Sequence, residues 1–266
     1  MDSAAKNREG NRKLGVFIHI GLVAVIFAIW YLATRGGVSD VILPSPEAVW
    51  NSFVDVVTNG YGTNKDSLFV HLLASGQRLG IAFLLSIITA VPLGLLSGYL
   101  PLARHLMDPI VEFYRPIPPL AYYTLLVLWL GISEGSKITL LYLAGFAPIY
   151  IACSSGVRRI NPDYIRASQM LGASKWQTFI HVVFPAALPD IFTGIRTAVG
   201  VEYTTLVAAE MVAAKTGIGW MVLDASNWLR SDVVFMGVIL MGITGILLNL
   251  VILSIEKAVV HWEGKA

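Results

Sequence analysis

The sequence carries RASQMLGASKWQTFIHVVFP at residues 166–185, a polar and basic stretch between two strongly apolar spans. Immediately before it, Asn161, Pro162 and Asp163 suit an N-cap, a first helical position and a first-turn acid. Gly172 suits the residue that follows a helix end. We therefore expect a helix of about ten residues, roughly 15 Å long.

One face of this expected helix carries Tyr164, Ile165, Ser168 and Leu171. We expect that face to have no membrane or core of its own to bury against, so it suits a groove on a partner protein. A solvated connector is the alternative interpretation. A second short helix, Lys175–Val183, is expected to lead into Pro185 and the next apolar span.

The composition indicates that lipid is the solvent for most of the chain. Of the 266 residues, 56% are hydrophobic and 14% are charged, with a mean hydropathy of +0.69. Soluble domains carry about 25% charged residues. The net charge of +2 gives no indication of a nucleic-acid partner. Cys153 is the single cysteine, so the chain forms no internal disulfide and no thiolate metal site.

Six apolar runs are long enough, or nearly long enough, to cross a bilayer, which takes about 20 residues for about 30 Å of hydrocarbon. They are Leu14–Thr34, Leu79–Leu102, Pro116–Ile132, Ile138–Val157, Ile191–Ala214 and Val233–Ile255. Backbone groups in lipid must pair within their own segment, which favours helices over open strands. The sequence thus predicts an all-α membrane protein with six transmembrane helices.

The basic residues predict the orientation. With the N-terminus inside, eleven Lys and Arg residues lie in inner segments and five in outer segments, which places both termini in the cytoplasm. Ser45 and Pro46 suit the start of a short interfacial helix in the outer loop. The expected organisation is an inner tail (1–13), a first transmembrane helix (14–34), an outer loop (35–67), a five-helix core (68–256) with the inner loop 158–185, and an inner tail (257–266).

A proline-rich break follows a charged helical stripe. Arg104, Asp108, Glu112 and Arg115 are spaced so that opposite charges share one face of a helix. The run 116–119, Pro-Ile-Pro-Pro, then ends that helix. Irregular backbone at membrane depth must be buried in protein or line a cavity. The break either lines the translocation path, with Arg115 and Pro118, or is a kink at the inner interface.

Three ionisable residues lie in the fifth span. Arg196, Glu202 and Glu210 fall within a sector of about 120° on a helix. Because charges in lipid are costly, this face must point at protein or water. Glu202 and Glu210 either line the substrate route or form interhelix ion pairs, whereas Arg196 is expected to be structural. Arg196 and Glu210 are about 21 Å apart along the axis, so each needs another partner.

The motifs of an enzyme are missing. The five histidines form no His-Glu-x-x-His pattern and no close metal pair, and no Gly-x-x-x-x-Gly-Lys-Ser/Thr loop is present. We therefore expect no catalytic residues, no metal site and no nucleotide bound by this chain. An ion-coupled transporter, with Glu202 and Glu210 carrying protons, is the rival to a transporter driven by a separate ATPase.

The inner loop resembles the EAA loop of permease subunits in ATP-binding cassette importers. That pattern is Glu-Ala-Ala, three residues, Gly, nine residues, then Ile-x-Leu-Pro. Ala167, Gly172 and Pro185 match it, and Val182 and Phe184 are conservative replacements at the right spacing. Arg166 stands where Glu is usual, and Ser168 stands where the second Ala is usual.

Further segments resemble the taurine, nitrate and aliphatic sulfonate branch of that family, and the run 112–122 resembles taurine permeases in particular. These segments are residues 43–46 (LPSP), 108–110 (DPI), 114–122 (YRPIPPLAY) and 206–210 (LVAAE). The resemblance implies the type I fold, a bacterial inner-membrane location and a substrate that is taurine or a related small sulfonate. It also implies a homodimer, two cytoplasmic ATPase subunits that bind ATP and Mg, and an extracytoplasmic substrate-binding protein.

The same resemblance implies that the loop helix sits in a cleft of the ATPase. The implied contact residues are Asn161, Tyr164, Ile165, Arg166, Ala167, Ser168, Leu171 and Gly172.

Overall fold

The structure is a computed structural model that describes residues 18, 21–36 and 39–261. The predicted tail 1–13 and residues 262–266 lie outside the described residues. Regular structure in the described part is helical, with a single isolated bridge between Tyr61 and Asp66. The elements are a helix at Gly21–Arg35, α2 (Pro46–Asn59), α3 (Leu68–Tyr99), α4 (Pro101–Tyr114), α5 (Pro119–Leu130), α6 (Glu134–Arg159), α7 (Pro162–Met170), α8 (Lys175–Thr178), the π-helix η1 (Phe179–Val183), α9 (Phe184–Ala213), α10 (Ile218–Asn227) and α11 (Ser231–Val259).

Within the described residues, four helices are long and apolar enough to cross a membrane. They are Leu68–Tyr99, Glu134–Arg159, Lys175–Ala213 and Ser231–Val259, and Gly21–Arg35 and Pro119–Leu130 are shorter apolar helices. Each of the six overlaps a predicted run. The all-α membrane class is therefore confirmed. α5 has 12 residues, about 18 Å at 1.5 Å per residue, which is too short to cross a bilayer on its own.

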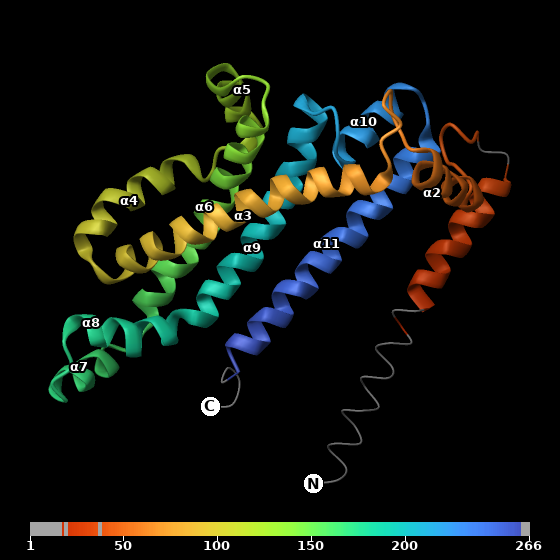
Figure 1. Cartoon of the computed structure of the whole chain (residues 1–266). Helices are drawn as coiled ribbons and strands as arrows, with labels where there is room; N and C mark the ends of the chain where they lie inside the picture. The colour runs from red at the N-terminus through yellow and green to blue at the C-terminus, as the bar shows by residue number, and fades with distance from the viewer. Residues whose placement is uncertain (1–17, 19–20, 37–38, 262–266) are drawn as a thin grey trace, which may run out of the picture.

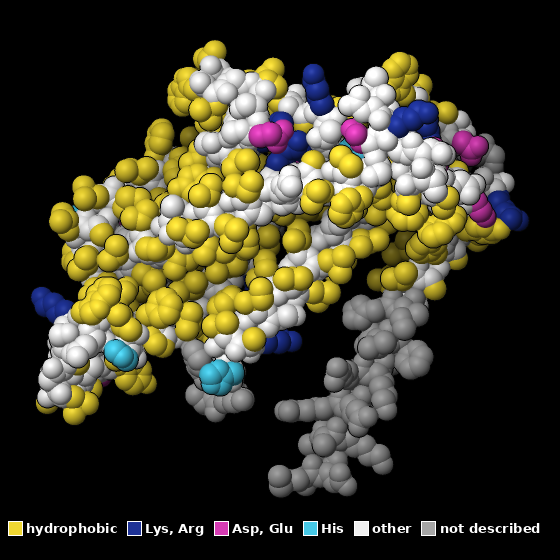
Figure 2. All heavy atoms as spheres, viewed as in Figure 1, with side chains coloured by type: hydrophobic (Ala, Val, Ile, Leu, Met, Phe, Trp, Pro, Cys, Tyr) yellow, Lys and Arg dark blue, Asp and Glu magenta, His cyan; other side chains and the backbone are white. Residues whose placement is uncertain are grey.

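The molecule has two polar ends and an apolar middle. α7 and α8 lie at one end with the C-terminal end of α11, and α2 and α10 lie at the opposite end (Figure 1). We call them the inner end and the outer end, after the orientation that the sequence predicts. On the face drawn in Figure 2, hydrophobic side chains cover the middle and charged side chains gather toward the ends. This distribution is the one expected of a protein that crosses a hydrocarbon layer.

The core is a close contact of α3, α6 and α9. A Cβ added at Gly94 of α3 would lie 2.7 Å from the Cβ of Cys153, and one at Gly98 would lie 2.6 Å from the Cβ of Val157. The small residues let the two helix backbones approach closely, as at many membrane helix contacts. Cys153 is buried here, in the apolar setting that the sequence predicts.

The second span starts earlier than predicted. The expected run began at Leu79, whereas α3 begins at Leu68 and includes Arg78. The prediction excluded every ionisable residue, but Arg78 is buried and paired within the bundle. At its other end α3 stops at Tyr99, because the chain bends before Pro101 and starts α4.

The inner loop joins the fifth span without a break. A separate helix 175–183 and a span beginning at Ile191 were expected, whereas Lys175–Ala213 forms one continuous apolar helix. A proline interrupts a helix because its ring clashes with the carbonyl four residues earlier. Here Pro185 follows the π-helical turn Phe179–Val183, whose wider spacing accommodates the ring. α8 is therefore continuous with α9.

The short outer helix forms as predicted. The Ser45 hydroxyl accepts a hydrogen bond from the Ala48 amide at 3.1 Å, and Pro46 is the first residue of α2. α2 also contacts the start of α11, where the Ser52 hydroxyl donates to Asp232.

The proline-rich break also forms as predicted. α4 ends at Tyr114 and α5 begins at Pro119. The stripe on α4, however, bonds across helices. Asp108 accepts a 2.6 Å hydrogen bond from the Tyr150 hydroxyl of α6 and lies 3.6 Å from the Arg158 guanidinium.

Candidate coupling surface and buried polar networks

The loop helix α7 has the caps that the sequence predicts. The Asn161 side chain accepts a hydrogen bond from the Asp163 amide at 2.9 Å, and Pro162 is the first helical residue. Gly172 has a φ of +86°, a left-handed conformation that favours glycine after a helix end. Helix formation here therefore follows from local signals in the sequence.

None of the residues of α7 is buried. Met170 is 88% exposed and Leu171 is 89% exposed, and Tyr164 is also exposed. Large apolar side chains in this arrangement on a short helix fit a groove on another protein. Arg166 pairs with Asp163 at 3.4 Å, but both side chains are 73% exposed, so the pair contributes little to stability.

The predicted contact face is divided between two roles, which corrects the expectation that it has nothing of its own to pack on. Ile165 packs against the main core cluster. The Ser168 hydroxyl lies 3.0 Å from the buried Thr178 hydroxyl. Ile165 and Ser168 therefore hold α7 against the start of the α8–η1–α9 helix, and Tyr164 and Leu171 point outward.

A hollow lies between α7 and this long helix. Its volume is about 370 Å³, with Leu171 and Gly172 on one side and Gln177 and His181 on the other. The exposed apolar side chains and the hollow together form what we call the coupling surface: Tyr164, Ala167, Met170, Leu171 and Gly172 with Gln177 and His181. Met170, Gln177 and His181 were not among the predicted contact residues, and Gln177 and His181 come beside α7 only through the fold.

Arg115 lies between two cavities at the proline-rich break. One cavity of about 370 Å³ lies between the break and α6, and a neighbouring one of about 210 Å³ lies between α4 and α6. Arg115 and Ile151 line both. Pro118 is exposed and lines neither. Arg115, Pro118, Glu202 and Glu210 were predicted as path residues. Of these four, only Arg115 lines either cavity.

Glu202 lies inside the α3–α6–α9 core. It is fully buried, and one carboxyl oxygen accepts a 2.9 Å hydrogen bond from the Ser86 hydroxyl. Its other oxygen has no hydrogen-bond partner among the described residues. A Cβ at Gly145 would lie 1.6 Å from the Glu202 carboxyl oxygen, so this glycine provides the space that the side chain fills.

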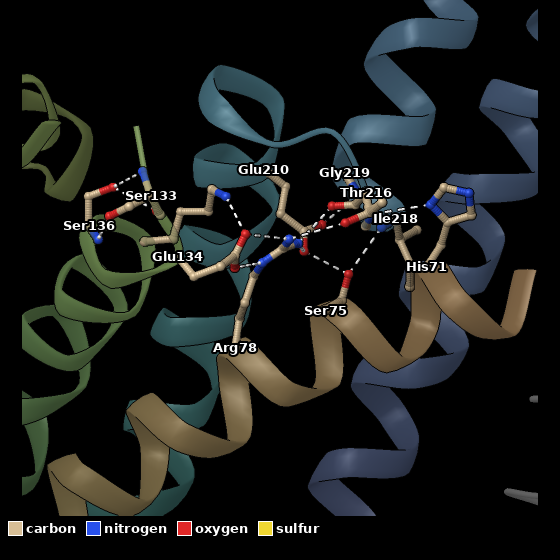
Figure 3. A network of polar contacts seen from close by, with 12 residues as sticks. His71, Ser75, Arg78, Ser133, Glu134, Ser136, Glu210, Thr216, Ile218 and Gly219 are labelled. Atoms are coloured by element: carbon tan, nitrogen blue, oxygen red, sulfur yellow. Dashed lines mark hydrogen bonds and ion pairs between the residues drawn. The ribbon is translucent and has the colours of Figure 1, made fainter. Parts of the chain in front are cut away.

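Glu210 is the centre of a buried network at the outer end (Figure 3). One carboxyl oxygen lies 2.7 Å from Nη1 of Arg78 and accepts a 2.7 Å hydrogen bond from Ser75. Nε of Arg78 reaches Glu134 of α6 at 2.5 Å, and Nζ of Lys137 is 2.7 Å from the same carboxylate. These contacts are interhelix ion pairs, which is one of the two interpretations open for Glu210 from the sequence.

The network also caps the first turn of α10. The Gly217 amide donates to His71 at 3.2 Å, the Ile218 amide to Ser75 at 3.0 Å and the Gly219 amide to Glu210 at 2.9 Å. The first amides of a helix have no partner within it, and they favour a negative group nearby. Glu210 thus joins α3, α9 and α10 through groups that would otherwise be unpaired.

Arg78 is the central residue that the sequence analysis missed. The available signal was a single arginine inside the otherwise apolar stretch 68–99, since an intramembrane charge implies a buried partner. Arg196, by contrast, lies 3.3 Å from Glu256 of α11, the structural role expected of it. No group of metal-ligating side chains occurs in the described part of the chain.

Comparison with known proteins agrees with this arrangement. Residues 90–262 match the family described as "Binding-protein-dependent transport system inner membrane component". The chain belongs to this family. It is therefore an integral inner-membrane component of a transport system, as the EAA-like loop predicts, and its fold is the type I fold of ATP-binding cassette permeases.

Several relatives cover nearly the whole chain. The taurine transport system permease protein TauC of Escherichia coli is 40% identical over 251 residues, covering 94% of this chain and 91% of the relative. A putative aliphatic sulfonates transport permease protein, SsuC of Bacillus subtilis, is 32% identical, with 98% and 93% covered. The nitrate import permease protein NrtB of Synechocystis is 33% identical, with 91% and 89% covered. The branch resemblance is thereby confirmed.

Proposed function

We propose that this permease imports taurine or a related small sulfonate and is driven by a separate cytoplasmic ATPase that grips α7. The similarity to TauC over 94% of the chain supports taurine as the first substrate to test. The aliphatic sulfonate and nitrate relatives make another alkanesulfonate or nitrate the alternative. Sulfonates and nitrate are both oxyanions, so Arg115 beside its two cavities suits any of them.

Two observations support the coupling to an ATPase: α7 is exposed, and the helix on which it packs continues without interruption into α9. α7 presents Tyr164 and Leu171 to the outside, while Ile165 and Ser168 fasten it to the α8–η1–α9 helix. A force applied to α7 therefore reaches α9, which carries both Glu202 and Glu210. ATPase closure would shift the permease between inward-open and outward-open states by binding one of them better.

The proposed assembly contains two copies of this chain, two ATPase subunits with ATP and Mg, and one extracytoplasmic substrate-binding protein. Six transmembrane segments, with both termini in the cytoplasm, agree with the six apolar helices and with the excess of inner Lys and Arg. In an apolar 18-residue stretch of α11, only 6% is buried inside the described structure. That helix accordingly has a surface available for lipid or for the second copy.

Within the membrane, we place Arg115 and the proline-rich break 116–119 on the translocation path, although Pro118 itself lines neither cavity. Glu202 and Glu210 are buried behind it, and they act on the path by fixing α9 against α3 and α6.

Uptake by proteoliposomes tests the function directly. The permease is reconstituted with its ATPase and binding protein, and uptake of taurine, ethanesulfonate and nitrate is compared with ATP present or omitted. We expect taurine uptake only with ATP. Uptake that follows an ion gradient without ATP would support the rival transporter class, and transport of nitrate without taurine would contradict the substrate.

A pair of substitutions at one residue tests the coupling helix. Gly172→Pro cannot keep the φ of +86°, so we expect uptake to be lost while the permease still inserts and folds. Gly172→Asn serves as the matched control, because asparagine tolerates a left-handed conformation. Equal uptake by both variants would count against the docking role.

A further inference from the structure

An outer pocket combines aromatic rings with one acidic and one basic side chain. It has a volume of about 390 Å³ and is lined by residues 61–63, Trp220, Asp224, Trp228 and Arg230. It lies at the α2 and α10 end, away from α7 and from the cavities at Arg115. Its volume falls within the range of about 300–1,000 Å³ typical of small-molecule sites.

The walls of this pocket are held in place from behind. The Trp220 ring stacks on His71 with 5.6 Å between ring centres, and it meets the edge of the Tyr61 ring at 6.1 Å. A Cβ at Gly62 would lie 2.9 Å from the Trp220 ring, so the backbone of the 61–63 loop packs closely against it. Trp228 forms the outer wall and is 74% exposed.

The acidic side chain has capacity left for a cation. Asp224 accepts a 3.0 Å hydrogen bond from the Tyr61 hydroxyl on one oxygen. Burial raises the pKa of Tyr61, so this hydroxyl remains a hydrogen-bond donor at neutral pH. The second oxygen of Asp224, Oδ1, accepts no hydrogen bond from any of the described residues. A carboxylate beside aromatic rings suits an ammonium group, because the carboxylate and the ring faces both attract a cation.

The basic side chain has capacity left for an anion. Arg230 uses Nε and Nη2 to hold Asp232, at 3.3 and 2.9 Å. The hydrogen bond to Asp232 raises the pKa of Arg230, which therefore stays charged. Its third nitrogen, Nη1, is left to bind an oxyanion, for which guanidinium geometry is well suited.

We propose that this outer pocket binds a small zwitterion that carries an ammonium group and a tetrahedral oxyanion a few bonds apart. Asp224 and the rings would hold the ammonium group, and Arg230 would hold the oxyanion. Two sources offer this chemistry: an aminoalkanesulfonate such as taurine, and the headgroup of phosphatidylethanolamine. The choice of taurine as a probe rests on the proposed function, whereas the lipid source does not.

The first arm measures taurine binding to the full-length permease in nanodiscs of phosphatidylglycerol, without ATP or partners. We expect saturable binding, with 2-hydroxyethanesulfonate and ethylammonium each weaker by about tenfold or more, because each lacks one charged group. Asp224→Asn and Arg230→Gln should each weaken taurine binding by about tenfold or more. Asp40→Asn and Lys215→Gln, which likewise each remove one charge at an exposed outer residue, should leave taurine binding unchanged.

The second arm uses nanodiscs that also contain phosphatidylethanolamine. If the headgroup is the source, native mass spectrometry should show this lipid retained by the wild type and lost from the Asp224 and Arg230 variants. Trp228→Ala is a further variant. Because Trp228 is exposed, this change should weaken binding of taurine or of the lipid without unfolding the chain.

The proposal is overturned if neither taurine nor phosphatidylethanolamine binding depends on Asp224 and Arg230. It is also overturned if these variants affect only docking of the substrate-binding protein, since the pocket would then be a protein contact. Binding to the pocket is measured without ATP or partners. A negative binding result would therefore overturn the pocket proposal without bearing on whether the complex shows ATP-driven uptake.

Discussion

The two ends of the molecule differ in how their polar groups are satisfied. At the outer end, Arg78 and Glu210 are buried and bonded to each other and to α6, α9 and α10. At the inner end, α7 has no buried residue, and its Arg166–Asp163 pair is open to solvent. Buried ion pairs and hydrogen bonds between helices fix the relative position of those helices, whereas an exposed helix is left for a partner. The contrast is the one that the proposed function requires, with an outer end that stabilises the bundle and an inner end on which the ATPase acts.

The largest expected effect breaks the outer network. Arg78→Met leaves Glu210 buried without its cation, and losing one partner of a buried ion pair costs about 3–5 kcal/mol. Arg166→Met at the inner end removes a pair that is 73% exposed on both sides, so its cost should be about 0–1 kcal/mol. Equilibrium unfolding in mixed micelles measures both. Similar losses for the two variants would remove the contrast between the ends.

A second prediction concerns the middle of the core, between the two ends. A Cβ at Gly145 would overlap the Glu202 carboxylate, whereas one at Gly200 would meet nothing within 4 Å. Gly145→Ala should lower the free energy of unfolding of the permease by about 1–3 kcal/mol, because the added methyl group overpacks the core. Gly200→Ala, on the same helix as Glu202, should be neutral or stabilising because alanine is the better helix former. If Gly145→Ala folds as stably as wild type, Glu202 does not occupy the space that the structure gives it.

The smallest expected effect is local to the inner end. Asn161→Ala removes the N-cap of α7 and should loosen that helix by about 1 kcal/mol. Because α7 has no buried residue, global unfolding should not change. Hydrogen exchange of the α7 amides should therefore accelerate while exchange in α3 and α6 stays the same. Acceleration throughout the bundle would mean that α7 is part of the stable core.

What the sequence predicts well is set by local chemistry. The caps Asn161 and Gly172 and the break at Pro116–Pro119 act through neighbouring backbone, so their effects can be inferred without the fold. The apolar runs likewise locate the six apolar helices, since the bilayer acts on each segment separately.

What the sequence predicts poorly depends on contacts between distant residues. Arg78 was assigned outside the second span because its partner Glu210 is 132 positions away. The inward contact of Ser168 depends on Thr178 across a turn. The continuity of α8 with α9 depends on a π-helical turn before Pro185, which a proline alone does not indicate. Which of Arg115, Pro118, Glu202 and Glu210 meets the substrate is likewise a question of packing.

The central claim is that α7 transmits the work of a separate ATPase without stabilising the permease itself. The most direct measurement is ATP-driven taurine uptake by the reconstituted complex carrying the double substitution Tyr164→Ala and Leu171→Ala, with Ile42→Ala at an exposed outer position as the control. We predict that uptake falls by about tenfold or more, as for truncated interface anchors, while permease unfolding changes by no more than about 0.5 kcal/mol. Wild-type uptake by the double variant would contradict the account.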